Sequence, residues 1–164
     1  MDPERFWQLM EQAETPSALH ELLDALPEPE LIAFERLHDE AVDRAYDWGV
    51  WGAAYVINGG CGDDTFMDFR AYLVSRGRAI YEAALADPDS LADVELEDDD
   101  GDDGWEAWSS PTMTVVHART GAYGFAGPRD LAARTPEHPS GEDWDEEDLA
   151  QRFPRLCAKY ESAG

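Results

Sequence analysis

The chain has 164 residues, a length that suits one compact domain with a single hydrophobic core. It carries 37 Asp and Glu against 12 Lys and Arg, which gives a formal charge of -25. A surface this negative repels phosphates, so the composition disfavours binding to nucleic acid or to a membrane surface and favours a basic protein or a divalent cation as partner.

The cysteine content and the hydropathy pattern indicate where the protein is found. Two cysteines, Cys61 and Cys157, fit a reducing compartment better than a disulfide framework. The N-terminus lacks the basic and apolar regions of a secretory signal, and no apolar run approaches the roughly eighteen residues of a membrane span. We therefore expect a soluble cytoplasmic protein, with no cofactor.

Amphipathic helices are predicted throughout the N-terminal part of the chain. Asp2 before Pro3, and Thr15 before Pro16, have the pattern of an N-cap followed by proline at the first helical position. A third and longer helix is predicted over residues 29–46. The apolar residues of the first two helices recur at helical spacing, namely Phe6, Leu9, Met10, Ala13, Leu19, Leu22, Leu23 and Leu26.

Residues 48–70 form the stretch on which the other helices are predicted to pack. Trp48, Trp51 and Tyr55 share one face of a helix, while small residues on its other faces allow close approach of a neighbour. The sequence Asn-Gly-Gly at 58–60 tolerates a positive φ and is expected to end this helix.

The next predicted helix begins at an aspartate N-cap and continues past Arg76 and Gly77 without a break. Asp63 or Asp64 is expected to be the cap. The apolar stripe of this helix continues past Arg76 and Gly77, through Phe66, Phe69, Leu73, Ile80 and Ala84.

The composition changes after residue 92. Residues 94–104 are a run of like charges that cannot bury itself, which predicts an exposed loop over 93–110 between a helical core at 1–92 and a C-terminal part at 111–164 that packs back on the core. The β-branched residues at 112–117, a turn at Thr120 and Gly121, and residues 122–125 predict a small β-hairpin.

Two helical segments are predicted near the end of the chain. A short one covers residues 129–134, and a capped helix begins near Trp144 and is interrupted by Pro154. The predicted fold is therefore one mainly α domain over residues 1–164, with about six helices, an acidic loop and a small hairpin.

Three motifs resemble a family of uncharacterised bacterial proteins, a domain of unknown function. They are Phe6-Trp7 in the first helix, W-G-A-A-Y-V-I-N-G-G-C-G-D-D-T-F at 51–66, and F-P-R-L-C-A-K-Y at 153–160. The family pattern is W-G-A-A-Y-x-I-x-G-G-C-x-D-D-x-F with a terminal F-P-x-L-W-A-K-Y. This chain departs from it at Cys157, where the pattern has Trp, and in an acidic insert at 95–103. The resemblance implies a soluble, mostly helical bacterial protein and no particular activity.

Cys61 is the best candidate for a catalytic nucleophile. It lies just before a predicted helix start, where free backbone N–H groups lower the pKa of a thiol, and its glycine neighbours leave room for a substrate. A base would have to come from elsewhere in the fold, such as His38 or His117. Asp63 and Asp64 oppose thiolate formation, so a packed, unreactive cysteine is the stronger interpretation.

The carboxylates beside Cys61 allow two other arrangements. Asp63, Asp64 and Asp68 could ligate a hard cation, although paired carboxylates at a helix start are more often caps, and no further ligands are identifiable. Alternatively, Asp64 or Asp68 could pair with Arg70 or Arg44 at the edge of the Trp48 and Trp51 rings, as a structural network or a polar-edged pocket. We predict no metal site.

The sequence leaves different classes of function open. One is an acidic interaction module that binds a basic protein, as immunity proteins, antitoxins and nucleic-acid mimics do. Another is a small-ligand-binding protein or enzyme using residues 48–70, although no phosphate-binding loop, G-x-S-x-G or H-E-x-x-H motif occurs. A third is an acidic surface without a specific partner, which predicts evenly spread charge instead of one concentrated face. The oligomeric state is left open.

Overall fold

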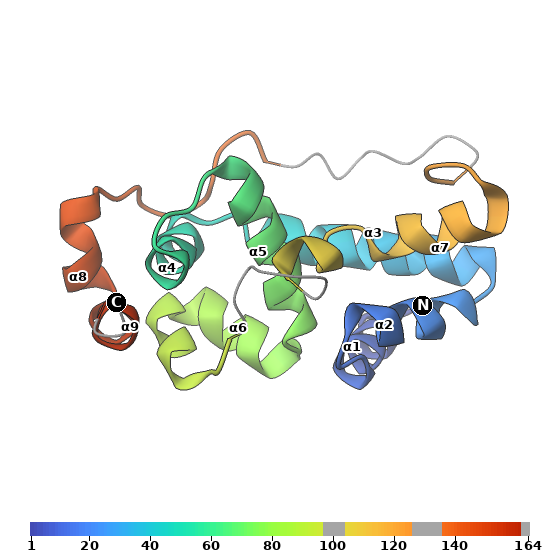
Figure 1. The fold of residues 1–164 in the computed structure, drawn as a ribbon, viewed down its shortest axis with the longest axis horizontal. Coiled ribbons are helices and arrows are strands. Elements are labelled where there is room, and N and C mark those ends of the chain that lie inside the picture. The colour runs from blue at the N-terminus through green and yellow to red at the C-terminus, as the bar shows by residue number, and fades with distance from the viewer. Residues whose placement is uncertain (97–103, 126–135, 162–164) are drawn as a thin grey trace.

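The computed structural model describes residues 1–96, 104–125 and 136–161 (Figure 1). These residues form nine α-helices and three 3-10 helices, so the mainly α prediction is confirmed and the predicted number of about six helices is too low. The elements are α1 (Pro3–Gln12), α2 (Pro16–Asp24), α3 (Glu28–Arg44), α4 (Trp48–Asn58), α5 (Asp63–Ser75), α6 (Arg78–Ala86), η1 (Pro88–Asp93), η2 (Trp105–Trp108), α7 (Pro111–Thr120), η3 (Glu146–Asp148), α8 (Leu149–Arg152) and α9 (Pro154–Tyr160).

The first two helices begin at the residues that their capping patterns predict. The Asp2 carboxylate accepts a hydrogen bond from the Arg5 amide at 2.8 Å, and the Thr15 hydroxyl accepts one from the Ala18 amide at 3.1 Å. Each bond satisfies one of the amides that a helix start leaves unpaired. Core residues on these two helices are Phe6, Leu9, Met10, Leu19 and Leu23.

Gly77 divides the stripe that the sequence pattern treats as one helix. Its φ of +91° lies outside the helical region, so α5 ends at Ser75 and α6 begins at Arg78. Glu11 of α1 accepts a hydrogen bond from the Arg78 amide at 3.1 Å and so caps α6 from another element. This break accounts for one of the additional helices.

The predicted β-hairpin is wrong, because its first strand is the helix α7. Pro111 occupies the first helical position, and Thr112, Val115 and Val116 bury one face at helical spacing. Gly121 ends the helix in the left-handed region, with φ +73°. The β-branched content that suggested a strand is therefore carried on a helix, whose buried face decides its conformation.

Helix α7 packs against α2 and α3, and one arginine fastens its end to α2. Arg119 donates to the carbonyls of Leu23, Asp24 and Leu26 and pairs with the Asp24 carboxylate at 2.9 Å. The carbonyls at the C-terminal end of a helix carry partial negative charge, so a cation is favourable there.

Helix α5 lies in the middle of the molecule and contacts α1, α3, α4, α6 and η2 (Figure 1). Phe69 and Tyr72 of α5 hold Trp105 of η2, with ring centroids 4.8 Å and 5.8 Å away. Trp105 and Trp108 are both buried. The predicted exposed loop at 93–110 thus contains two core residues, Trp105 and Trp108, while residues 97–103 of the acidic run lie outside the described residues.

The elongated molecule has two distinct ends (Figure 1). Helices α1, α2 and α7 form one end, and α4, α8 and α9 form the other. The predicted segment at 129–134 lies outside the described residues, and the predicted interruption at Pro154 separates α8 from α9.

His38 is a buried histidine of α3 whose charged form the fold disfavours. Its ring is 4% exposed and stacks on Phe34 with centroids 6.2 Å apart. Among the described residues, no group forms a hydrogen bond with its buried Nε2. Burial lowers the pKa of His38 from 6.5 to about 4.

The buried histidine predicts a loss of stability on acidification. The unfolded chain binds a proton near pH 6.5 that native His38 binds only near pH 4, so this group lowers the free energy of unfolding as the pH falls between those values, by about 3 kcal/mol in total. Urea unfolding of the wild type and His38→Gln at pH 7 and pH 4.5 measures this contribution. The difference between the two proteins should shrink at pH 4.5. An equal pH dependence in wild type and His38→Gln would contradict the assignment.

Candidate functional site

Aromatic side chains from three parts of the chain meet on one face of α4. Trp48 and Trp51 stack with ring centroids 5.2 Å apart, and Trp51 also stacks on Phe66 of α5 at 4.8 Å. Trp144, which precedes η3, meets Tyr55 edge-on at 5.1 Å. We call these five residues the aromatic junction. Its three predicted members, Trp48, Trp51 and Tyr55, do share one side of the helix.

The polar atoms of the aromatic junction form hydrogen bonds within the protein. Trp51 Nε1 donates to the Cys61 carbonyl at 2.9 Å, and Trp144 Nε1 donates to the Trp48 carbonyl at 2.8 Å. The Tyr55 hydroxyl donates to Glu146 at 2.5 Å, a bond that raises the pKa of Tyr55. The junction therefore joins α4 both to the loop before α5 and to the segment around Trp144.

Asp47, at the start of α4, binds the chain at Ser140, just before Trp144. One carboxylate oxygen caps the helix by accepting from the Gly49 and Val50 amides at 2.8 Å and 3.3 Å. The other oxygen accepts from the Ser140 hydroxyl at 2.9 Å. The Trp48 amide also donates to the Ser140 carbonyl at 2.8 Å. The Asp47 carboxylate thus both caps α4 and binds the chain at Ser140.

Gly52 allows the turn between α8 and α9 to lie directly against α4. A Cβ atom at this position would stand 2.5 Å from the ring of Phe153 and 3.1 Å from Trp144 Nε1. The ring of Phe153 is buried, so it has little room to move away. The contact therefore requires glycine at residue 52.

The buried Asp89 of η1 fixes the start of α9. Its carboxylate accepts from the Arg155 amide at 3.1 Å and the Leu156 amide at 2.9 Å. An anion at a helix N-terminus satisfies unpaired amides and interacts favourably with the helix dipole. Together with Asp47 and Gly52, it holds the C-terminal segments against α4.

Residues 142–148, here called the acidic segment, contain six carboxylates and Trp144. Arg152 bonds the carbonyls of Glu142 and Asp143 at 2.9 Å and 2.8 Å and lies 3.6 Å from the Glu142 carboxylate. Within the part of the chain that the structure describes, no Lys or Arg pairs with Asp143, Asp145, Glu147 or Asp148. The acidic segment is thus an exposed group of carboxylates whose backbone is bonded to Arg152 and whose Trp144 is bonded to α4.

The residues predicted around Cys61 occupy the start of α5. Cys61 is half-buried between α4 and α5, with Sγ 3.8 Å from the Gly62 carbonyl. The residue at the N-cap of α5 is Gly62, while Asp63 and Asp64 are exposed in its first turn, so the prediction that one of them caps the helix is wrong. They remain favourable there because of the helix dipole.

Arg70 is buried, with its guanidinium 5.2 Å from the ring centroid of Phe66 in the aromatic junction, and it pairs with none of the predicted carboxylates in the described part of the chain. It is 6% exposed, donates to the Val42 carbonyl at 3.1 Å, and places its guanidinium 4.6 Å from the ring centroid of Tyr46. Burial lowers the pKa of Arg70, although the charge of Asp43 opposes this shift.

The predicted pairing of these arginines with α5 carboxylates is replaced by other contacts. Arg44 forms a two-pronged ion pair with Glu82 at 2.8 Å and 2.9 Å. Asp68 accepts a hydrogen bond from Ser109 at 2.5 Å, which ties α5 to the residue after η2.

Trp144 and Ser140 were missed by the sequence analysis, whereas the close approach of a neighbour at the small residues of α4 was predicted and occurs at Gly52. The signal for Trp144 was its position as the single large apolar side chain within an acidic run. Nothing in the local sequence points to Ser140 or to the contact between Gly52 and Phe153, because both depend on segments that are distant along the chain.

Pockets, metal-binding clusters and membrane-spanning helices are the other features of the described residues that could indicate a site. The surface pockets there include four whose linings are described, and Asp68 is the one predicted site residue that lines any of these four. The described part of the chain has no group of three His, Cys, Asp or Glu placed to hold a metal ion. No helix within it combines the length and the apolar character needed to cross a membrane.

A family model identifies the family to which the chain belongs. Residues 1–118 match the model of the family described as "Protein of unknown function (DUF4240)", and the chain belongs to this family. The matched region ends within α7, so the acidic segment and Phe153 lie outside it. No curated protein and no solved structure matches the chain.

The environments of the two cysteines predict different reactivities. Cys157 is 4% exposed, and burial raises the pKa of its thiol, whereas Cys61 is half-buried in a loop. Iodoacetamide should therefore modify Cys61 in the native protein well before Cys157, because alkylation requires an accessible thiolate. Mass spectrometry over time, with Cys61→Ser and Cys157→Ser as single-site controls, measures both rates. Faster labelling of Cys157 would contradict these environments, and labelling of Cys61 with a midpoint far below pH 8 would favour its role as a nucleophile.

Proposed function

We propose that the protein is an acidic interaction module that binds a basic protein partner. The observation that carries this proposal is the acidic segment, in which exposed carboxylates are gathered beside the aromatic junction and held in a fixed conformation. A preformed surface of this kind loses little conformational entropy when a partner binds.

Most basic side chains of the described residues are engaged away from the acidic segment. Many of the described Lys and Arg side chains already pair with carboxylates, namely Arg36 with Glu40, Arg44 with Glu82, Arg78 with Glu4, Arg119 with Asp24, Arg155 with Asp93 and Lys159 with Glu95. These pairs neutralise charge locally. The carboxylates of Asp145, Glu147 and Asp148 have no such cation among the described residues and would attract a partner's Lys and Arg.

The chemistry beside the acidic segment suits a basic protein surface. Carboxylates accept charge-assisted hydrogen bonds from Lys and Arg, and Trp and Tyr rings attract the same cations through their faces. Trp144 and Tyr55 are both part of the aromatic junction. Immunity proteins, antitoxins and nucleic-acid mimics are acidic binders of this general kind.

We also propose that the protein acts in the cytoplasm of a bacterium. Both cysteines are free thiols, which is the usual state in a reducing compartment. The other candidate function, a small-ligand-binding protein or enzyme that uses residues 48–70, stays a prediction. The interaction function is preferred because Arg70 lies in the core and the indole N–H groups of Trp51 and Trp144 already have partners.

The proposal can be tested by neutralising carboxylates in two matched sets. The first set is Asp145→Asn, Glu147→Gln and Asp148→Asn, and the control set is Glu14→Gln, Glu28→Gln and Glu137→Gln, all exposed. Partners captured from native cytosol at low salt would be purified, and their association rates measured by surface plasmon resonance at several salt concentrations.

The two sets remove the same number of charges, so they separate a specific surface from total charge. For a true partner, the acidic-segment set should slow association by about tenfold at low salt, and the control set should have a much smaller effect. The difference should fade at high salt, since the screening length is about 8 Å at physiological ionic strength. Equal effects of both sets, or no basic partner at all, would overturn the proposal.

A further inference from the structure

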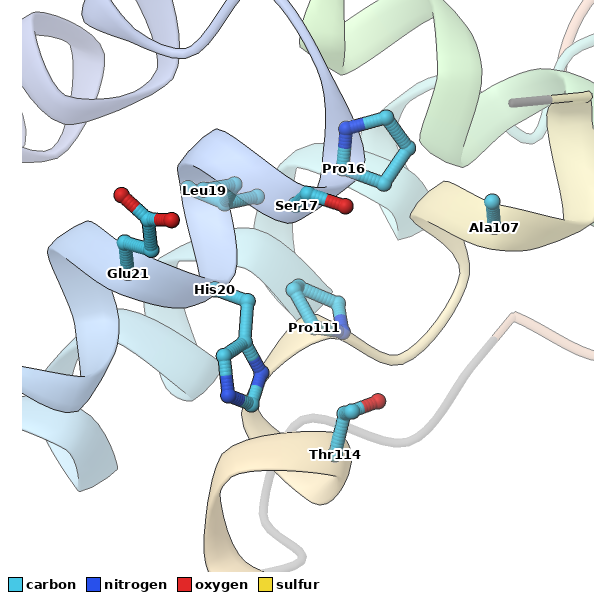
Figure 2. A pocket seen from close by; sticks show the side chains of 8 residues that line it. All are labelled: Pro16, Ser17, Leu19, His20, Glu21, Ala107, Pro111 and Thr114. Atoms are coloured by element: carbon cyan, nitrogen blue, oxygen red, sulfur yellow. The ribbon is translucent and has the colours of Figure 1, made fainter. Parts of the chain in front are cut away.

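Two adjoining surface pockets lie along η2 and α7, between α2 and α5. One pocket, of about 420 Å³, lies between α2, η2 and α7, and is lined by Leu19, His20, Glu21 and Pro111, among others (Figure 2). A second pocket, of about 580 Å³, lies between α5, η2 and α7. Ala107 and Thr114 line both pockets, so the two are adjoining parts of one depression, which we call the methionine groove.

Two exposed methionines lie at the α5 end of the methionine groove. Met67 is 49% exposed and Met113 is 40% exposed, and both line the second pocket. They are two of the four large apolar side chains that are exposed among the described residues. Methionine is flexible and polarizable, and it is common on surfaces that receive apolar side chains of a binding partner.

The rim of the methionine groove carries one sign of charge. Glu21 lines the first pocket, and Asp68 and Glu106 line the second. No Lys or Arg is among the residues that line either pocket. The groove thus combines apolar contact with negative charge, which is complementary to a segment with an apolar stripe flanked by cations.

We propose that the methionine groove binds a basic amphipathic helix of a partner protein. Helices dock in such grooves through apolar side chains at helical spacing, while their polar faces meet the rim. Met67 and Met113 would receive the apolar side chains, and Glu21, Asp68 and Glu106 would pair with Lys or Arg. The inference rests on the proposed function only in taking the partner to be basic, and it concerns a different surface.

A pair of synthetic peptides provides the probe. One is an amphipathic helix of leucine and lysine, and the other has the same composition in shuffled order, so that charge is equal and only the apolar stripe differs. Fluorescence anisotropy at physiological salt measures both affinities. The amphipathic peptide should bind at least about tenfold more tightly than its isomer, because the isomer cannot present a continuous stripe.

The four methionines of the chain report where the peptide binds. In the wild-type protein with ¹³C-methyl methionine, the signals of Met67 and Met113 should shift on titration with the peptide, while that of Met10, which is 1% exposed, should not. This readout requires no substitution and therefore does not depend on how a variant folds.

A matched pair of substitutions tests the same location. Ala107 is exposed and lines both pockets, so Ala107→Trp should block the methionine groove and weaken binding at least about tenfold. Ala83→Trp, at an exposed position on α6, should leave the affinity unchanged. Equal affinity for both peptides, or binding that neither shifts Met67 and Met113 nor responds to Ala107→Trp, would overturn the groove proposal. The proposed function would still stand on its own test with the acidic-segment variants.

Discussion

The tightest steric constraint on the C-terminal arrangement is the contact between α4 and the ring of Phe153 at Gly52. With no Cβ at residue 52, the Phe153 ring reaches the backbone of α4, and α8 and α9 can lie beside it. Trp144 packs over the same position and donates to the Trp48 carbonyl. A helix interior ordinarily disfavours glycine by about 1 kcal/mol relative to alanine, so the packing that this glycine permits must exceed that cost.

Asp47 and Asp89 extend this constraint into a fixed C-terminal arrangement. Asp47 couples the cap of α4 to Ser140, and Asp89 caps α9 from η1. The carboxylates of Asp47 and Asp89 thus fix the backbone on either side of the acidic segment, whose own carboxylates are exposed. Trp48, Trp51 and Tyr55, which the sequence suggested as part of a ligand site, are also part of the aromatic junction that joins α4 to this segment. The interaction proposal follows from this combination of rigid backbone and unneutralised charge.

The features that could be predicted from the sequence were those encoded over a few residues. The caps at Asp2 and Thr15 and the shared face of Trp48, Trp51 and Tyr55 depend on local spacing. The hairpin was wrong because β-branched content at 112–117 was given more weight than the helical spacing of its buried residues. The joint itself could not be predicted, since the bond from Trp144 to Trp48 spans 96 residues and a glycine carries no signal of what packs against it.

The most direct test of this account is a double-mutant cycle between Gly52→Ala and Phe153→Leu, read by urea unfolding and by hydrogen exchange of α8 and α9. Gly52→Ala should lower the free energy of unfolding by about 1–3 kcal/mol and accelerate exchange in both helices, because the added methyl group overlaps the Phe153 ring. The cost should be smaller in the Phe153→Leu background, where the ring is absent. If Gly52→Ala instead stabilises the protein, as alanine does in an unconstrained helix, and leaves exchange unchanged, the close contact does not hold the C-terminal segment.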